Sequence, residues 1–168
     1  EVTALVEWPV AISGGIDARF MAMPPEVLIT TIESHQRYFP VRDGEGTLLP
    51  QFVTVANVES LDIKQVIAGN ERVVRPRLED ALFFWEKDRK QPLADYLPRL
   101  DKVTFQKGLG SYADKSDRLV TLAGRLAESL GTDMNTARRA AELAKADLVT
   151  DMVFEFTELE GVMGGHYA

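Results

Sequence analysis

Three arginines in the string GNERVVRPR are the strongest candidates for binding chemistry in this sequence. Arg72 and Arg75 are spaced i, i+3, and Arg77 follows a proline that stiffens the backbone. Guanidinium groups match phosphate oxygens in geometry and stay charged at any working pH, so the pattern indicates contact with a polyanion such as RNA. Nearby acidic residues could instead absorb the arginines in a surface network, and spacing alone leaves both interpretations open. These are Glu71, Glu79 and Asp80.

A second candidate is the glycine-rich string that starts at Gly108. Gly108, Gly110 and Ala113 match Gly-x-Gly-x-x-Ala, and Glu128 lies near the distance of a ribose-binding acid. A dinucleotide site needs a strand after the helix, whereas the pattern here leads into a second helix. The sequence therefore favours a plain turn. Cations around this turn are further candidates for RNA contact, namely Lys107, Lys115 and Arg118.

The sequence offers few side chains that could bind a metal or act in acid–base catalysis. His35 and His166 are the only histidines, and neither has a second ligand at i+3 or i+4. His35 on a helix face is typical of a structural residue. The apolar residues among the acids of DMVFEFTELEG predict a packed element with a solvated acidic face. Those acids are Asp151, Glu155, Glu158 and Glu160. We predict no metal site and no catalytic residue.

The sequence patterns around these residues predict both strands and helices, and therefore an α+β chain. Alternation predicts a strand over residues 2–8. Pro24 and Pro25 precede a predicted helix over 26–36, with His35 on its apolar face beside Leu28 and Ile32. Two β-rich runs around DGEG predict a hairpin whose second strand lies inside the sheet. The second half is predicted to be helical, with Gly131 at a helix C-cap and Thr132 as the cap of a further helix. The helix before Gly131 carries an amphipathic stripe made of Leu119, Leu122, Ala123, Leu126 and Leu130.

Charge is distributed unevenly along the 168 residues. The net charge is −7, yet residues 64–145 carry 16 basic and 12 acidic side chains, whereas both ends are acidic. The middle region is the part that suits a polyanion, unless its cations merely cover solvated helices. Cysteine is absent, which excludes disulfide and thiol chemistry. We expect no membrane span and no signal peptide, and a start without methionine predicts part of a longer protein.

Several longer strings resemble the β-subunit family of bacterial heterotetrameric glycyl-tRNA synthetases. They run in order through nearly the whole chain: EWPV, ESHQRYFPVRD, FVTVANVES, VIAGNERVVRPRLEDALFFWEKD, FQKGLGSYADKSDR and KADLVTDMVFEFTELEGVMGGHYA. The resemblance implies an internal piece of a much longer cytoplasmic subunit. Residues 1–90 would then belong to a B3/B4-like α+β domain, and residues 91–168 would open an all-α, HD-like helical domain.

The same resemblance implies a role in ATP-dependent glycyl-tRNA aminoacylation by an α₂β₂ enzyme. The partners would be the α subunit, which binds ATP and magnesium, and glycine tRNA, while this chain holds no cofactor of its own. An HD hydrolase carries His beside Asp, but Asp147 follows Ala144, Lys145 and Ala146, so metal hydrolysis is doubtful here. Two alternatives remain: a metal-dependent or editing hydrolase, and a docking scaffold that does not contact RNA.

Overall fold

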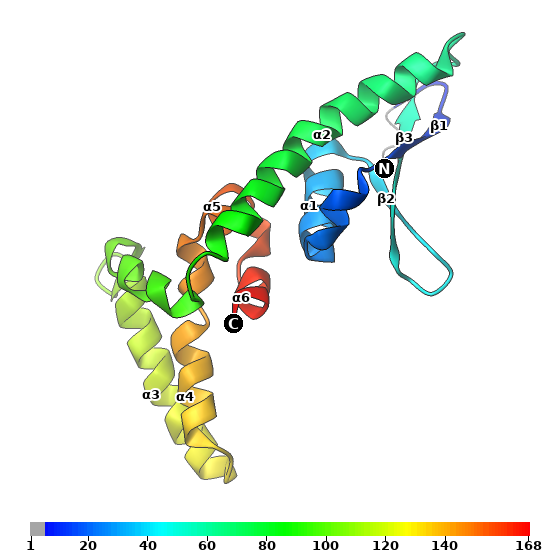
Figure 1. Ribbon diagram of the computed structural model, residues 1–168. Coiled ribbons are helices and arrows are strands. Elements are labelled where there is room, and N and C mark those ends of the chain that lie inside the picture. The colour runs from blue at the N-terminus through cyan, green and yellow to red at the C-terminus, as the bar shows by residue number, and fades with distance from the viewer. Residues whose placement is uncertain (1–5) are drawn as a thin grey trace. The chain divides into compact units, whose positions relative to one another are not determined.

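The computed structural model describes residues 6–168 and divides the chain into two compact units, Glu1–Trp85 and Glu86–Ala168 (Figure 1). Its mixture of helices and small antiparallel sheets confirms the α+β class. Of the strand predicted at the N-terminus, residues 2–5 lie outside the described part. The prediction is wrong for Val6–Trp8, which precede the first strand, β1 (Val10–Gly15).

The first unit is built on a three-stranded antiparallel sheet in the order β1-β3-β2. The hairpin of β2 (Phe39–Arg42) and β3 (Leu48–Ala56) is confirmed, with β3 as the central strand. Its loop is closed by Asp43, whose Oδ1 accepts the N–H groups of Glu45 and Thr47 at 3.0 and 2.8 Å. The apolar run of β3 therefore lies between two strands, as its sequence predicts.

Two helices and a short 3₁₀ helix, η2 (Ala18–Ala22), complete this unit. Helix α1 (Pro25–Gln36) starts at its prolines and buries Leu28 and Ile32, but His35 is exposed, which corrects its predicted place on the apolar face. Helix α2 (Ile63–Asp88) buries residues at helical spacing and continues through Pro76. Its buried residues in this unit are Val74, Leu78, Ala81 and Trp85.

The second unit begins with the end of α2 and is mainly helical. A 3₁₀ helix, η3 (Leu93–Lys102), leads to a small hairpin of β4 (Thr104–Gln106) and β5 (Gly110–Ser111), which the sequence patterns do not predict. Helices α3 (Tyr112–Leu130) and α4 (Met134–Leu143) lie side by side in Figure 1. Gly131 joins them in the left-handed conformation at φ 65°, as predicted for a C-cap glycine.

The predicted helix after Thr132 is broken into several short elements. Asp133, not Thr132, caps α4, because its carboxylate accepts the N–H groups of Asn135 and Thr136. The chain then turns through η4 (Ala146–Val149), α5 (Asp151–Glu155), η5 (Thr157–Leu159) and α6 (Val162–Tyr167). Within residues 6–168, no helix is both long and apolar enough to span a membrane.

Candidate nucleic-acid interface

Asp88, the last residue of α2, ties together four parts of the second unit. Its side chain is almost fully buried, with 1% of the residue exposed. Oδ1 accepts the Tyr96 hydroxyl at 3.2 Å and the Asp151 N–H at 3.1 Å. Oδ2 accepts the Met152 N–H at 2.9 Å and the Tyr167 hydroxyl at 3.1 Å. One carboxylate thus fixes η3, the start of α5 and the end of α6 against the end of α2.

The two tyrosines in this arrangement remain hydrogen-bond donors. Burial, reinforced by the neighbouring Asp88 carboxylate, raises the pKa of Tyr167 far above its ordinary value. Burial likewise raises the pKa of Tyr96. Both phenols therefore stay protonated at physiological pH and hold the carboxylate in place.

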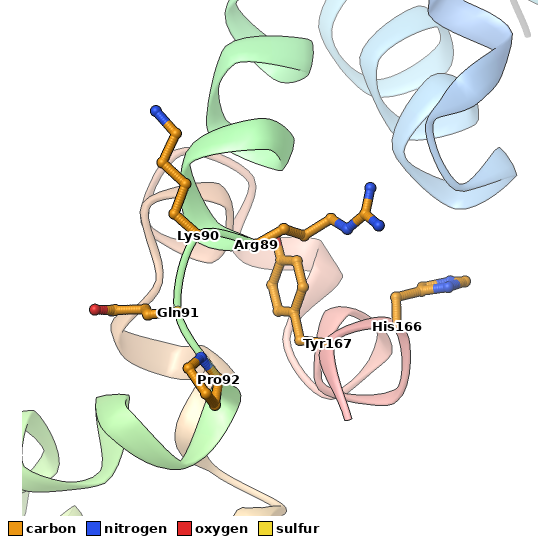
Figure 2. A pocket seen from close by; sticks show the side chains of 6 residues that line it. All are labelled: Arg89, Lys90, Gln91, Pro92, His166 and Tyr167. Carbon is orange, nitrogen blue, oxygen red and sulfur yellow. The ribbon is translucent and has the colours of Figure 1, made fainter.

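An open hollow of about 410 Å³ lies between the α2–η3 connection and α6, and Tyr167, which donates to Asp88, forms part of its wall. None of the described residues that line it is acidic. In the view of Figure 2, the Arg89 side chain extends to the same side as His166, whereas Lys90 extends the other way. The lining residues are Arg89, Lys90, Gln91, Pro92, His166 and Tyr167.

A second hollow of about 280 Å³ adjoins the first and shares Lys90 and Gln91 with it. It adds Lys87 and Arg99, and the one acid among its described lining residues, Asp151, is paired with Lys87 at 2.9 Å. We call the four exposed cations of these two hollows the basic cluster: Lys87, Arg89, Lys90 and Arg99. Their concave setting and surplus positive charge suit a phosphate backbone.

The basic cluster is a feature that the sequence analysis does not identify. No role is predicted there for the string KDRKQP, which spans the boundary between the predicted domains at residues 90 and 91. The sequence does contain a signal for this cluster, since three of the four residues 87–90 are cations. The fourth residue, an acid, falls on the buried side of the helix. Asp88 is that acid, and its carboxylate is buried among the hydrogen-bond donors described above, while the three cations around it face outward.

The three predicted arginines lie exposed on α2 in the first unit. At 3.6 residues per turn, Arg72 and Arg77 project about 140° apart around the helix, so the three do not form a single patch. The proposed surface network is not observed within residues 6–168. Glu71 accepts the Gly15 N–H at 2.7 Å, and Glu79 pairs with Arg19 at 2.5 Å.

The three cations near the glycine-rich turn lie in the second unit, and two of them hold that turn in place. Lys115 places its ammonium 4.0 Å from the centre of the Phe105 ring, a cation–π contact. Arg118 donates to the Leu109 carbonyl at 3.1 Å and so ties the β4–β5 turn to α3. Lys107 is exposed at the turn.

The glycine motif is a structural turn. Gly108 and Gly110 both have positive φ, 84° and 85°. The N-terminus of α3 is closed by a capping box, in which the Asp114 carboxylate accepts the Ser111 N–H at 2.7 Å. A carboxylate at the first turn disfavours a phosphate there. Helix α3 also leads into α4 and not into a strand, as the sequence predicts.

Asp147, at the position of the HD aspartate, is fully buried and serves as a backbone clamp. Its Oδ2 accepts the N–H groups of Gly161 and Gly164 at 2.6 and 2.8 Å, while Oδ1 has no hydrogen-bond partner among the described residues. Burial raises the pKa of this carboxyl group. Within residues 6–168, no group of three or more His, Asp or Glu side chains could hold a metal, so the residues present do not fit an HD metal site.

We expect Asp147→Asn to preserve the fold at neutral pH, whereas Asp147→Ala lowers the free energy of unfolding by about 2 kcal/mol because two partly buried N–H donors lose their acceptor. Because the pKa of Asp147 is higher in the folded protein than in the unfolded chain, this group stabilises the fold most at pH values below its unfolded-state pKa. The contribution is lost as the pH rises through its folded-state pKa. Asparagine removes that pH dependence. Urea unfolding of the three proteins at several pH values measures both effects; equal losses in the two variants would contradict the clamp.

Two of the four acids in the C-terminal segment 151–160 form ion pairs that have a structural role. Asp151 pairs with Lys87, and Glu160 pairs with Lys145 at 3.0 Å. Glu155 and Glu158 are exposed. The segment also supplies buried apolar residues, among them Met152, Val153 and Phe156, although Phe154 is 83% exposed. Its carboxylates therefore line the outside of a packed element.

Comparison with known proteins places these features in one family. The family model described as "Glycyl-tRNA synthetase beta subunit" matches residues 1–168. The glycine–tRNA ligase beta subunits of Edwardsiella ictaluri and Proteus mirabilis are each 56% identical to the chain over all 168 residues. That of Photobacterium profundum is 55% identical over the same length.

The chain spans about a quarter of the length of these curated relatives, since the matched region covers 24% of each. The matched range covers both units and so contains the positions of the basic cluster, the glycine turn and the Asp147 clamp. The chain therefore belongs to the glycyl-tRNA synthetase beta-subunit family.

Proposed function

We propose that this chain binds and positions glycine tRNA within a cytoplasmic glycine–tRNA ligase. The observation that carries the proposal is the basic cluster, where two adjoining hollows display four exposed cations and, among their described lining residues, a single acid that is already paired. Cations of this kind neutralise phosphates and thereby fix the orientation of a nucleic acid without reading its sequence. Membership of a tRNA synthetase family identifies tRNA as the nucleic acid that such a surface would bind.

The reaction itself belongs to the assembly and not to this chain. The enzyme would be an α₂β₂ heterotetramer that joins glycine to tRNA at the expense of ATP, with ATP and magnesium bound by the α subunit. This chain supplies no catalytic residue in the proposal. Arg72, Arg75, Arg77 and Lys107 remain candidate contacts to other parts of the tRNA. Lys115 and Arg118 take second place because each already holds the β4–β5 turn.

The proposal is tested by charge reversal in the basic cluster of the whole enzyme. We expect Arg89→Glu with Lys90→Glu to raise the KM for tRNA at least tenfold, because two attractive contacts become repulsive. The KM values for glycine and ATP should stay unchanged, and the α₂β₂ assembly should remain intact on size-exclusion chromatography. Loss of assembly would instead support a docking scaffold without RNA contact.

A further inference from the structure

Helix α3 displays three leucines on consecutive turns with most of their surface exposed. We call Leu122, Leu126 and Leu130 the leucine stripe; they are 54%, 61% and 74% exposed. Their i, i+4, i+8 spacing places them on one side of the helix. The amphipathic stripe predicted for this helix also includes Leu119 and Ala123, which are half-buried, whereas these three leucines are exposed. Aligned apolar side chains of this size are typical of a contact surface.

The leucine stripe is distinct from the face by which α3 meets α4. The buried residues of α3 are small: Ser116, Gly124 and Ala127. Arg138 of α4 lies directly over Gly124, since a Cβ built there would come within 2.5 Å of the arginine Nε. The α3–α4 contact therefore depends on close approach of small residues, and the stripe lies on another side of α3, where it is left exposed within residues 6–168.

The surroundings of the stripe indicate the chemistry of its partner. A hollow of about 380 Å³ begins at Leu122 and is lined mainly by apolar surface, with Asp117, Arg118 and Thr121 around it. Arg118 and Arg125, two turns apart, flank Leu122 along one edge. An amphipathic helix would fit this surface if its apolar residues covered the leucines and acidic residues faced the arginine edge.

We propose that the leucine stripe is covered by a helix from the part of the same beta polypeptide that lies outside these 168 residues. Relatives are about four times as long as the matched region, so most of the subunit is available to cover it. Three leucines aligned on successive turns are enough for contact with one amphipathic helix. The proposal rests on family membership and is independent of tRNA binding.

The test measures thiol labelling in the full-length beta subunit. A thiol introduced as Leu126→Cys would be compared with one introduced as Glu128→Cys, which is exposed on another side of the same turn, in a subunit whose other cysteines are replaced. We expect the thiol at position 126 to react with a maleimide at least tenfold more slowly than the thiol at position 128. This difference should be present in the beta subunit alone and should not depend on its concentration.

Every other pattern overturns the proposal and identifies a different occupant. Slow labelling only after addition of the α subunit would assign the stripe to the subunit interface. Slowing that increases with beta concentration would assign it to a second copy, and slowing only with tRNA would assign it to RNA. Equal rates at the two positions, whether both fast or both slow, would show that no segment covers the stripe specifically.

Discussion

Asp88→Asn should lower the free energy of unfolding of the second unit by about 2–4 kcal/mol. Each carboxylate oxygen of Asp88 accepts one backbone N–H and one tyrosine hydroxyl. Whichever way an asparagine is oriented, its amide NH₂ faces a buried or partly buried N–H donor that then has no acceptor, and the charge-assisted character of the other bonds is lost as well. Asp147→Asn has no such cost, because one oxygen alone accepts both donors there.

The measurement is urea unfolding followed by circular dichroism, combined with hydrogen exchange at the amides of Asp151 and Met152. Both amides donate to Asp88, so their exchange should quicken in the variant. Asp101→Asn is the matched control, since Asp101 is exposed in the same unit and should tolerate the change within about 0.5 kcal/mol. An Asp88 variant as stable as this control would show that the carboxylate does not hold the unit together.

Replacing Arg89 and Lys90 together by alanine should weaken tRNA binding by the whole enzyme roughly ten- to a hundredfold at physiological salt. Both side chains line the larger hollow, and Lys90 lines both. The four hydrogen bonds described for Asp88 use neither side chain, and circular dichroism of the variant checks that the fold is retained. Filter binding or fluorescence anisotropy with labelled glycine tRNA gives the affinity.

Two further variants make this result specific. Lys64→Ala with Lys102→Ala removes the same charge from exposed positions outside the basic cluster and should change the affinity less than threefold. A triple alanine variant at Arg72, Arg75 and Arg77 tests the surface that the sequence favours. If the control pair weakens binding as much as the pair at Arg89 and Lys90, net charge and not the basic cluster governs the interaction.

Local patterns in the sequence are sufficient for the hairpin, α1 and the end of α3. In each case one residue type at one position carries the signal: Asp43 in the turn, Pro25 at a helix start and Gly131 at a helix end. The long helix α2 is harder to predict, because Pro76 has no N–H to donate and normally ends or kinks a helix. Here the helix continues on both sides of it.

Predictions that depend on packing between distant segments are incomplete. The periodicity of Leu122, Leu126 and Leu130 indicates an apolar face correctly, but it does not say whether the partner of that face lies within the same 168 residues. The basic cluster is not predicted either, because it too depends on contacts between distant segments. The sequence alone does not show that Lys87, Arg89 and Lys90 face outward together. That arrangement follows from Asp88, which turns inward and accepts hydrogen bonds from Asp151, Met152 and Tyr167, all more than 60 positions further along the chain.

The central claim is that the basic cluster contacts the phosphate backbone of tRNA, and the salt dependence of affinity tests it most directly. The logarithm of the binding constant for glycine tRNA would be measured against the logarithm of salt concentration, for the wild-type enzyme and for the variant with alanine at positions 89 and 90. We predict a slope shallower by about 1.5–2 in the variant, because two phosphate contacts are lost. Identical slopes for the two enzymes would contradict the claim.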